Sequence, residues 1–154
     1  MVSEGTKGRF TLTGKVQEGD CSFSISNAQP ADQGFYEFRF HDGNHKYFYQ
    51  NNRLHLTVTD APASPTISNC TSAGCRVEVI EGTSLSLLCS AESNPPANLS
   101  WAKTGQNSTD PLNSSSGRLD VSHVTTDNGG DYMCRAMNEH GNSTASVRVV
   151  ITSK

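Results

Sequence analysis

Two stretches of this chain share one pattern and differ at one position: NGGDYMC at residues 128–134 and DQGFYEFR at residues 32–39. In the first stretch a tyrosine stands two residues before a cysteine, and in the second a tyrosine stands two residues before Phe38. A tyrosine so placed is typical of a strand that crosses the core of a two-layered β-sandwich. The chain is therefore predicted to hold two related strands, one of which lacks the core cysteine.

The stretch at residues 128–134 belongs to a larger set of core residues. Leu85, Leu87 and Cys89 recur at every second position, which predicts a strand with one buried face that ends on a cysteine. Trp101 follows, and the set ends with Tyr132 and Cys134. In an immunoglobulin sandwich two cysteines join the sheets and an indole packs on the sulfurs, in this order along the chain.

The short separation of the two cysteines suits a constant-type domain without the extra strands of a variable domain. We therefore predict a C2-type immunoglobulin-like β-sandwich over residues 66–154. Its core is expected to hold the Cys89–Cys134 disulfide with Trp101 and Tyr132.

The preceding residues read as half of a second sandwich, because 154 residues are too few for two domains of roughly 100 residues each. Strands are expected at 10–12, 21–25, 34–40 and 54–58, with a Pro-containing linker at 61–65. The tyrosine motif identifies 34–40 as strand F, so the others become D, E and G. Strands A, B and C are missing from this prediction, since hardly any chain precedes Gly8.

Alternation along strand F assigns its side chains to two faces. Tyr36, Phe38 and Phe40 are expected in the core, which turns Glu37 and Arg39 outward. An outward guanidinium can bind a carboxylate through two parallel hydrogen bonds. The alternative is that Arg39 is an ordinary solvated arginine, paired at most with Glu37.

Composition argues against several classes of function. A net charge of −3 gives no basic stripe for nucleic acid. The sequence has no Gly-x-Ser-x-Gly, no His-Glu-x-x-His and no phosphate-cradling loop, so we expect neither an enzyme nor a cofactor. The residues HDGNH at 41–45 read as a polar hairpin loop rather than a metal site.

Asparagine sequons point to the secretory pathway. Five Asn-x-Ser/Thr sites occur where about 2 to 3 are expected by chance, and they favour a glycosylated, disulfide-bonded protein. The five are Asn69, Asn98, Asn107, Asn113 and Asn142. Neither a secretion signal nor a membrane span is recognisable, and we interpret this as truncation of a cell-surface or extracellular parent.

Three cysteines stay outside the core pair. A zinc site at Cys70 and Cys75 would need two more suitably spaced ligands, which the sequence lacks. These two could form a local disulfide, supply a partner for the lost half-domain, or be left by a splice variant. Cys21, Cys70 and Cys75 cannot all pair with one another, so an odd cysteine is expected.

At these residues the chain resembles the sialic-acid-binding immunoglobulin-like lectins, the Siglecs. Their terminal variable-type (V-set) domain has its core cysteine on strand E, as at Cys21, and an aromatic in the vacated strand F position, as at Phe38. The arginine that grips the sialic acid carboxylate matches Arg39. A Lys-aromatic pair that lines the sugar matches Lys46 and Tyr47.

The resemblance extends to the second domain and has three departures. SNPP at 93–96 and CRA at 134–136 are similar to the family's membrane-proximal constant-type repeats. A strand B partner for Cys21, the N-terminal aromatic that packs on the sugar, and the family's interdomain cysteine are missing.

The resemblance implies an all-β fragment of a cell-surface receptor that binds sialylated glycans in cell adhesion or immune regulation. Residues 1–60 would be the C-terminal half of a V-set domain, with Arg39 on the carboxylate and Lys46 and Tyr47 on the rest of the sugar. The alternative is an immunoglobulin-superfamily adhesion or receptor fragment that binds protein partners without glycan specificity. Membrane attachment would come only through segments absent from this chain.

Overall fold

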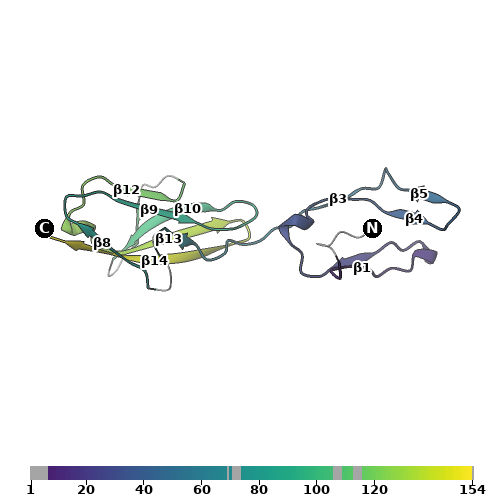
Figure 1. The fold of residues 1–154 in the computed structure, drawn as a ribbon, viewed down its shortest axis with the longest axis horizontal. Coiled ribbons are helices and arrows are strands. Elements are labelled where there is room, and N and C mark those ends of the chain that lie inside the picture. The colour runs from purple at the N-terminus through teal and green to yellow at the C-terminus, as the bar shows by residue number, and fades with distance from the viewer. Residues whose placement is uncertain (1–6, 69, 71–73, 106–108, 113–115, 154) are drawn as a thin grey trace. The chain divides into compact units, whose positions relative to one another are not determined.

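The computed structural model describes residues 7–68, 70, 74–105, 109–112 and 116–153, with the side chains of residues 109–111 left out. The chain divides into two compact units, Met1–Val58 and Thr59–Lys154, and each is considered by itself (Figure 1). Apart from three short 3₁₀ turns, the regular structure of the described residues is β-strand. The prediction of an all-β, immunoglobulin-like fold is confirmed.

The second unit is a two-layered sandwich (Figure 1). One sheet has the order β11-β10-β13-β14-β8 and the other the order β12-β9-β7. The five strands of the first sheet are β8 (Arg76–Ile80), β10 (Asn98–Thr104), β11 (Thr109–Leu112), β13 (Gly130–Asn138) and β14 (Gly141–Thr152). The second sheet consists of β7 (Thr66–Ile67), β9 (Leu85–Ser90) and β12 (Arg118–Val121).

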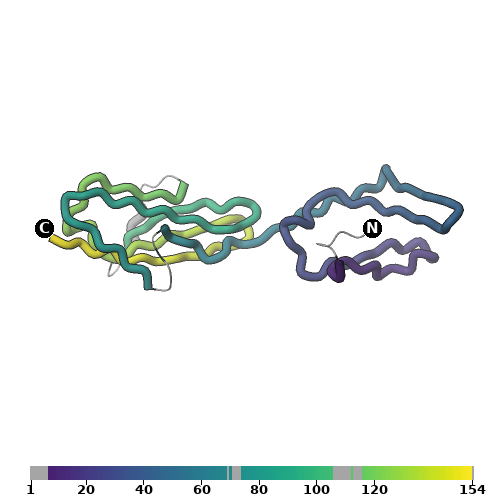
Figure 2. The backbone as a smooth tube through the Cα atoms, in the orientation of Figure 1, coloured from purple at the N-terminus to yellow at the C-terminus, as the bar shows by residue number. Residues whose placement is uncertain are grey.

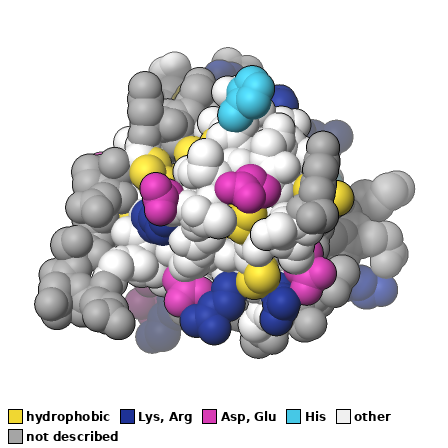
Figure 3. All heavy atoms as spheres, turned by 90° about the vertical axis from the view of Figure 1, so that its left-hand side faces the viewer, with side chains coloured by type: hydrophobic (Ala, Val, Ile, Leu, Met, Phe, Trp, Pro, Cys, Tyr) yellow, Lys and Arg dark blue, Asp and Glu magenta, His cyan; other side chains and the backbone are white. Residues whose placement is uncertain are grey.

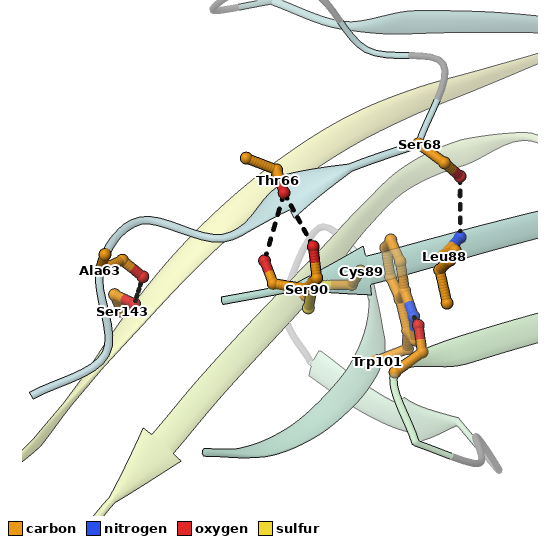
Figure 4. Close-up of a disulfide and its surroundings, with 10 residues drawn as sticks. Ala63, Thr66, Ser68, Leu88, Cys89, Ser90, Trp101 and Ser143 are labelled. Carbon is orange, nitrogen blue, oxygen red and sulfur yellow. Dashed lines mark hydrogen bonds between the residues drawn. A yellow bond between two sulfur atoms is a disulfide. The ribbon is translucent and has the colours of Figure 1, made fainter. Parts of the chain in front are cut away.

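The core of the second unit lies between these sheets, and it contains the residues that the sequence pattern predicts. Burial alternates along β9 so that Leu85, Leu87 and Cys89 face inward. Cys89 is bonded to Cys134 of β13, with their Cα atoms 6.4 Å apart, so the disulfide joins the two sheets. Trp101 lies beside Cys89 (Figure 4).

Two hydrogen bonds fix the aromatic residues of this core. The buried Trp101 donates its indole N–H to the carbonyl of Gly117 at 2.8 Å, which satisfies the one polar atom of the indole. The hydroxyl of Tyr132, itself buried, donates to the carbonyl of Asn128 at 2.7 Å. Asn128 ends the 3₁₀ turn η4 (Thr126–Asn128) directly before β13.

The first unit is built from short antiparallel pairs (Figure 2). The strand β1 (Phe10–Leu12) pairs with β2 (Phe23–Ile25), β3 (Gly34–Tyr36) with β6 (Leu54–Leu56), and β4 (Arg39–His41) with β5 (Lys46–Phe48). The 3₁₀ turns η2 (Val16–Glu18) and η3 (Pro30–Asp32) lie between them. Among the described residues, no strand of this unit is longer than three residues.

The continuous strand predicted at 34–40 is wrong, because the structure interrupts it between β3 and β4. From the Tyr36↔Leu54 pair to the Arg39↔Phe48 pair, one strand advances by three residues and its partner by six. The surplus residues form a turn that the amide of Asn52 closes on the carbonyl of Tyr49 at 3.3 Å. This local mismatch leaves residues 37 and 38 outside both ladders.

Tyr36 and Phe38, which are predicted to lie in the core, are only partly buried. Both side chains are half-buried, and both line an open cleft of about 840 Å³ within the first unit. The inward direction of Tyr36, Phe38 and Phe40 agrees with the alternation, since all three line this cleft. The facing β1–β2 hairpin covers them only in part: Phe10 and Phe23 lie against the ring of Tyr36 at centroid distances of 5.8 and 6.1 Å, and the cleft beside them stays open.

Of the remaining cysteines, Cys70 and Cys75 form a local disulfide with a sequence separation of 5. The structure thus selects one of the three possibilities that the sequence leaves open. Cys21 is exposed and carries a free thiol.

Candidate functional site

The β4–β5 hairpin positions the residues proposed to contact sugar. Its register pairs Arg39 with Phe48, Phe40 with Tyr47 and His41 with Lys46. Cross-strand partners lie on the same face of a sheet, whereas neighbours along a strand lie on opposite faces. The hairpin therefore has one face with Arg39, His41, Lys46 and Phe48, which we call the Arg39 face.

The guanidinium of Arg39 is exposed and lies over an aromatic ring. Its Cζ atom is 4.4 Å from the centroid of Phe48, within the range of a cation–π contact. This contact restricts the arginine without occupying its N–H donors. Within the described part of the chain Arg39 forms no ion pair, so its donors are available to a carboxylate.

Glu37, the acid nearest to Arg39 in sequence, has a different partner. Its Oε1 lies 2.6 Å from Nε of Arg53. Glu37 is half-buried and lines the cleft, since the interruption between β3 and β4 breaks the alternation that predicts an outward side chain. The expected alternative, in which Arg39 pairs with Glu37, is not what the structure shows.

Lys46 shares the Arg39 face, two residues along β5 from Phe48. Residues that far apart on one strand are separated by about 6.8 Å. Its side chain is exposed, as is that of its cross-strand partner His41. The ammonium group of Lys46 is therefore a second positive group on this face, carried by the residue diagonally across the hairpin from Arg39 at about 7–8 Å.

The hairpin loop next to Lys46 is held by Asp42. The carboxylate of Asp42 accepts the backbone N–H groups of His45 at 2.7 Å and Asn44 at 3.1 Å. These bonds, with that of His45 the largest, lower the pKa of Asp42. The loop is thus a locally bonded hairpin turn, and the described residues contain no cluster of three or more metal-ligating side chains.

Tyr47 lies on the opposite face from Arg39. It pairs with Phe40 across the hairpin, and both line the cleft. Its ring also stacks on that of His45 at a centroid distance of 6.3 Å. The structure therefore brings Arg39 and Lys46 together and does not place Tyr47 with them; Phe48 is the aromatic beside the guanidinium. Period-two alternation applied to residues 46–48 would have identified Phe48.

The sequons of the second unit differ in what the structure describes. Asn98 on β10 and Asn142 on β14 are both exposed. Asn69, Asn107 and Asn113 lie outside the described residues. The described chain has no helix long and apolar enough to cross a membrane.

The two units are of the immunoglobulin class by sequence as well as by fold. Residues 64–138 match the immunoglobulin domain family Ig_3, and residues 2–59 match the immunoglobulin V-set domain family. A solved structure of the insect immune protein hemolin aligns with a TM-score of 0.64 at 21% identity, over 95% of this chain and 35% of hemolin.

Within the immunoglobulin class, the chain is similar in sequence to sialic acid-binding Ig-like lectins. Sialic acid-binding Ig-like lectin 5 of Homo sapiens is 34% identical over 97% of this chain, and sialic acid-binding Ig-like lectin 13 of Pan troglodytes is 35% identical over 72% of it. The chain belongs to the immunoglobulin superfamily and has the Siglec-like arrangement of a V-set domain followed by a constant-type domain. It spans 27% of the length of each of these relatives.

Proposed function

We propose that this chain is the glycan-recognition part of a Siglec-like cell-surface receptor, in which Arg39 binds the carboxylate of a terminal sialic acid. The observation that carries the proposal is an exposed guanidinium that rests on Phe48 and forms no ion pair with a described residue. The names of its relatives, sialic acid-binding Ig-like lectins, support the same ligand class.

The Arg39 face offers three complementary groups to such a ligand. The guanidinium fork matches a carboxylate through two parallel, charge-assisted hydrogen bonds, each contributing roughly 1.5 to 3 kcal/mol. Phe48 adds apolar surface beside it, and Lys46 can donate to a sugar hydroxyl. Solvent exposure and ordering of the glycan offset most of this gain, so we expect a Kd near 1 mM, or about −4 kcal/mol.

Tyr47 belongs to this proposal only in a secondary role. Because it faces the cleft, it can support the hairpin from behind but cannot contact the sugar that Arg39 holds unless the hairpin rearranges. We therefore assign the aromatic contact to Phe48.

Recognition in this proposal is binding without chemistry, so no enzymatic activity and no cofactor are involved. A cell-surface or extracellular location fits the two disulfides and the exposed sequons Asn98 and Asn142. Sialylated glycoproteins or glycolipids would be the partners, in adhesion or immune regulation.

The test uses the full 154-residue chain and saturation-transfer NMR with a sialylated trisaccharide and its asialo counterpart. We expect transfer to the sialylated probe alone. Arg39→Ala should abolish it, Arg39→Lys should weaken it because the bidentate fork is lost, and Phe48→Ala should weaken it more than Tyr47→Ala. Arg118→Ala, which changes an exposed arginine of the second unit, is the matched control.

Equal binding by wild type and Arg39→Ala, or equal transfer to both sugars, would contradict the proposal. Either result would favour the alternative of an immunoglobulin-superfamily fragment that binds proteins without glycan specificity.

A further inference from the structure

The two described sequons of the second unit lie in one row across its larger sheet. Asn98 of β10 pairs with Met137 of β13, and Met137 pairs in turn with Asn142 of β14. Adjacent strands are about 4.8 Å apart, so the two asparagines are separated by about 10 Å across Met137.

This row lies on the outer face of the sheet. The row three residues away contains Trp101 and Cys134, which pair with one another and are buried in the core. An odd number of residues along a strand reverses the face. Asn98, Met137 and Asn142 are accordingly all exposed, and Met137 is an apolar side chain with 46% of its surface exposed.

Both asparagine amides are available for modification. Neither side chain has a hydrogen-bond partner within the described ranges of the chain. The hydroxyl residues of the two sequons, Ser100 and Thr144, share the outer face, since both align with Arg135 in the next outward row.

Hydrogen bonds attach the first residues of this unit to the opposite, core-facing side of β13 and β14. The hydroxyl of Ser143, the middle residue of one sequon, donates to the carbonyl of Ala63 at 2.7 Å. The amide of Asn138 donates to the carbonyls of Asp60 and Pro95 at 2.8 and 3.1 Å. These bonds lie on the core side of β13 and β14, so they leave the outward row clear.

We propose that Asn98 and Asn142 both carry N-linked glycans, and that this pair flanks Met137 and covers the surrounding end of the outer sheet face. In the modification, the amide nitrogen of each asparagine attacks the anomeric carbon of a lipid-pyrophosphate-linked oligosaccharide. A C–N bond forms, the C–O bond to pyrophosphate breaks, and the lipid pyrophosphate and a proton leave.

Two bulky, hydrated chains about 10 Å apart leave no room for a protein surface to reach the methionine between them. This end of the sheet is then excluded as a protein-docking surface. Contacts through the same face are confined to the other end, where Asp131 of β13 and Arg148 of β14 form an ion pair at 2.7 Å.

The experiment uses the full chain, secreted from mammalian cells behind a secretion leader. Site occupancy is read by mass spectrometry after enzymatic removal of glycans, which converts each modified asparagine to aspartate. Shielding is read as the rate of Met137 sulfoxide formation in hydrogen peroxide. We expect both sites to be occupied, and Met137 to oxidise several-fold faster in the Asn98→Gln/Asn142→Gln double variant.

Met133, on the same face but two rows away, is the internal control and should change less. Should the double variant fail to fold, removal of glycans from the folded wild-type protein gives the same comparison. An unmodified asparagine at either site, or a Met137 oxidation rate that does not depend on the glycans, would overturn the proposal. No sialic acid ligand enters this experiment, so its outcome is independent of the proposed glycan recognition.

Discussion

Both units contain a tyrosine corner, a turn closed by a tyrosine hydroxyl before a strand, but the strands that follow the two corners differ in length. In both units a 3₁₀ turn with a capping box precedes the strand, and a tyrosine hydroxyl donates to a carbonyl four residues earlier: Tyr36 to Asp32 at 2.5 Å and Tyr132 to Asn128 at 2.7 Å. The strand that follows has 3 residues in the first unit and 9 in the second.

The difference shows which part of this motif is local. A tyrosine corner closes over a few residues and needs no distant partner. A long strand needs ladders, and β13 lies between β10 and β14, whereas β3 pairs with β6 alone. Exposed apolar side chains follow the same division, since eight of the eleven large ones among the residues that the structure describes are in the first unit. At the end of the second unit that faces the viewer in Figure 3, acidic and basic side chains surround scattered apolar ones.

The largest expected effect comes from removing disulfides, both of which lie in the second unit. The disulfide between Cys89 and Cys134 closes a separation of 45 residues, so replacing both with alanine should destabilise the second unit by about 4 kcal/mol in the chain-entropy model. Replacing Cys70 and Cys75, with a separation of 5, should destabilise it by about 2 kcal/mol. Urea unfolding followed by Trp101 fluorescence measures both.

Hydrogen exchange in the first unit provides the control for these variants. Amides of β2 and β3 should exchange at wild-type rates in both. Faster exchange there would mean that the stability of the first unit depends on the second unit. That result would contradict the view that the two tyrosine corners form independently.

A smaller effect compares the two corner hydroxyls. Tyr132→Phe leaves a carbonyl without its donor inside a packed unit, and should destabilise it by about 1 kcal/mol. Tyr36→Phe removes the corresponding bond from a half-buried ring, where water can replace it, and should have less effect. Urea unfolding reports the first variant, and hydrogen exchange of residues 30–36 the second. If Tyr36→Phe destabilised its unit as much as Tyr132→Phe or more, the first tyrosine corner would be as well shielded from water as the second.

The smallest effect concerns an ion pair that the second corner lacks. Two hydrogen bonds of 2.7 Å from the guanidinium of Arg9, together with the N–H of Gln29, lower the pKa of the buried Asp32 carboxyl to about 2, from an ordinary value of 3.8. Because the pKa in the folded state is the lower one, this pair stabilises the first unit above pH about 4. The stabilisation is lost as the pH falls toward about 2.

Carbon NMR of the Asp32 carboxyl checks this value directly. The expected titration midpoint is about 2 in the wild type, and it should rise toward 3.8 in Arg9→Gln. Asp131, whose pKa is lowered by Arg148 in the second unit, should keep its midpoint in that variant. An unchanged Asp32 midpoint would show that Arg9 is not the cause.

The sequence predicts most residues of the candidate site locally, and the structure separates one of them from the others. Arg39 and Lys46 share a face as a resemblance to the Siglecs implies, but that resemblance also assigned Tyr47, which the hairpin register places on the opposite face. Adjacent residues of a strand cannot share a face, so Lys46 and Tyr47 can both contact one sugar only where the strand is irregular. Phe48 was missed because the family pattern was applied without this restriction.

The sequence by itself determined the fold class, the Cys89–Cys134 pair, the indole that packs beside it and both tyrosine corners. These features depend on residue type at short or regular spacing, and their physical causes are local hydrogen bonding and the burial of one strand face. Only the tertiary structure decided where strand F breaks, that Cys70 bonds to Cys75, that Glu37 pairs with Arg53, and that Asn98 and Asn142 lie in one row. The strand break, the Glu37–Arg53 pair and the row of asparagines depend on register between separate strands, and register is fixed by the pairing of whole strands rather than by any one of them. The Cys70–Cys75 bond is local, but the sequence spacing alone permits other partners for these cysteines.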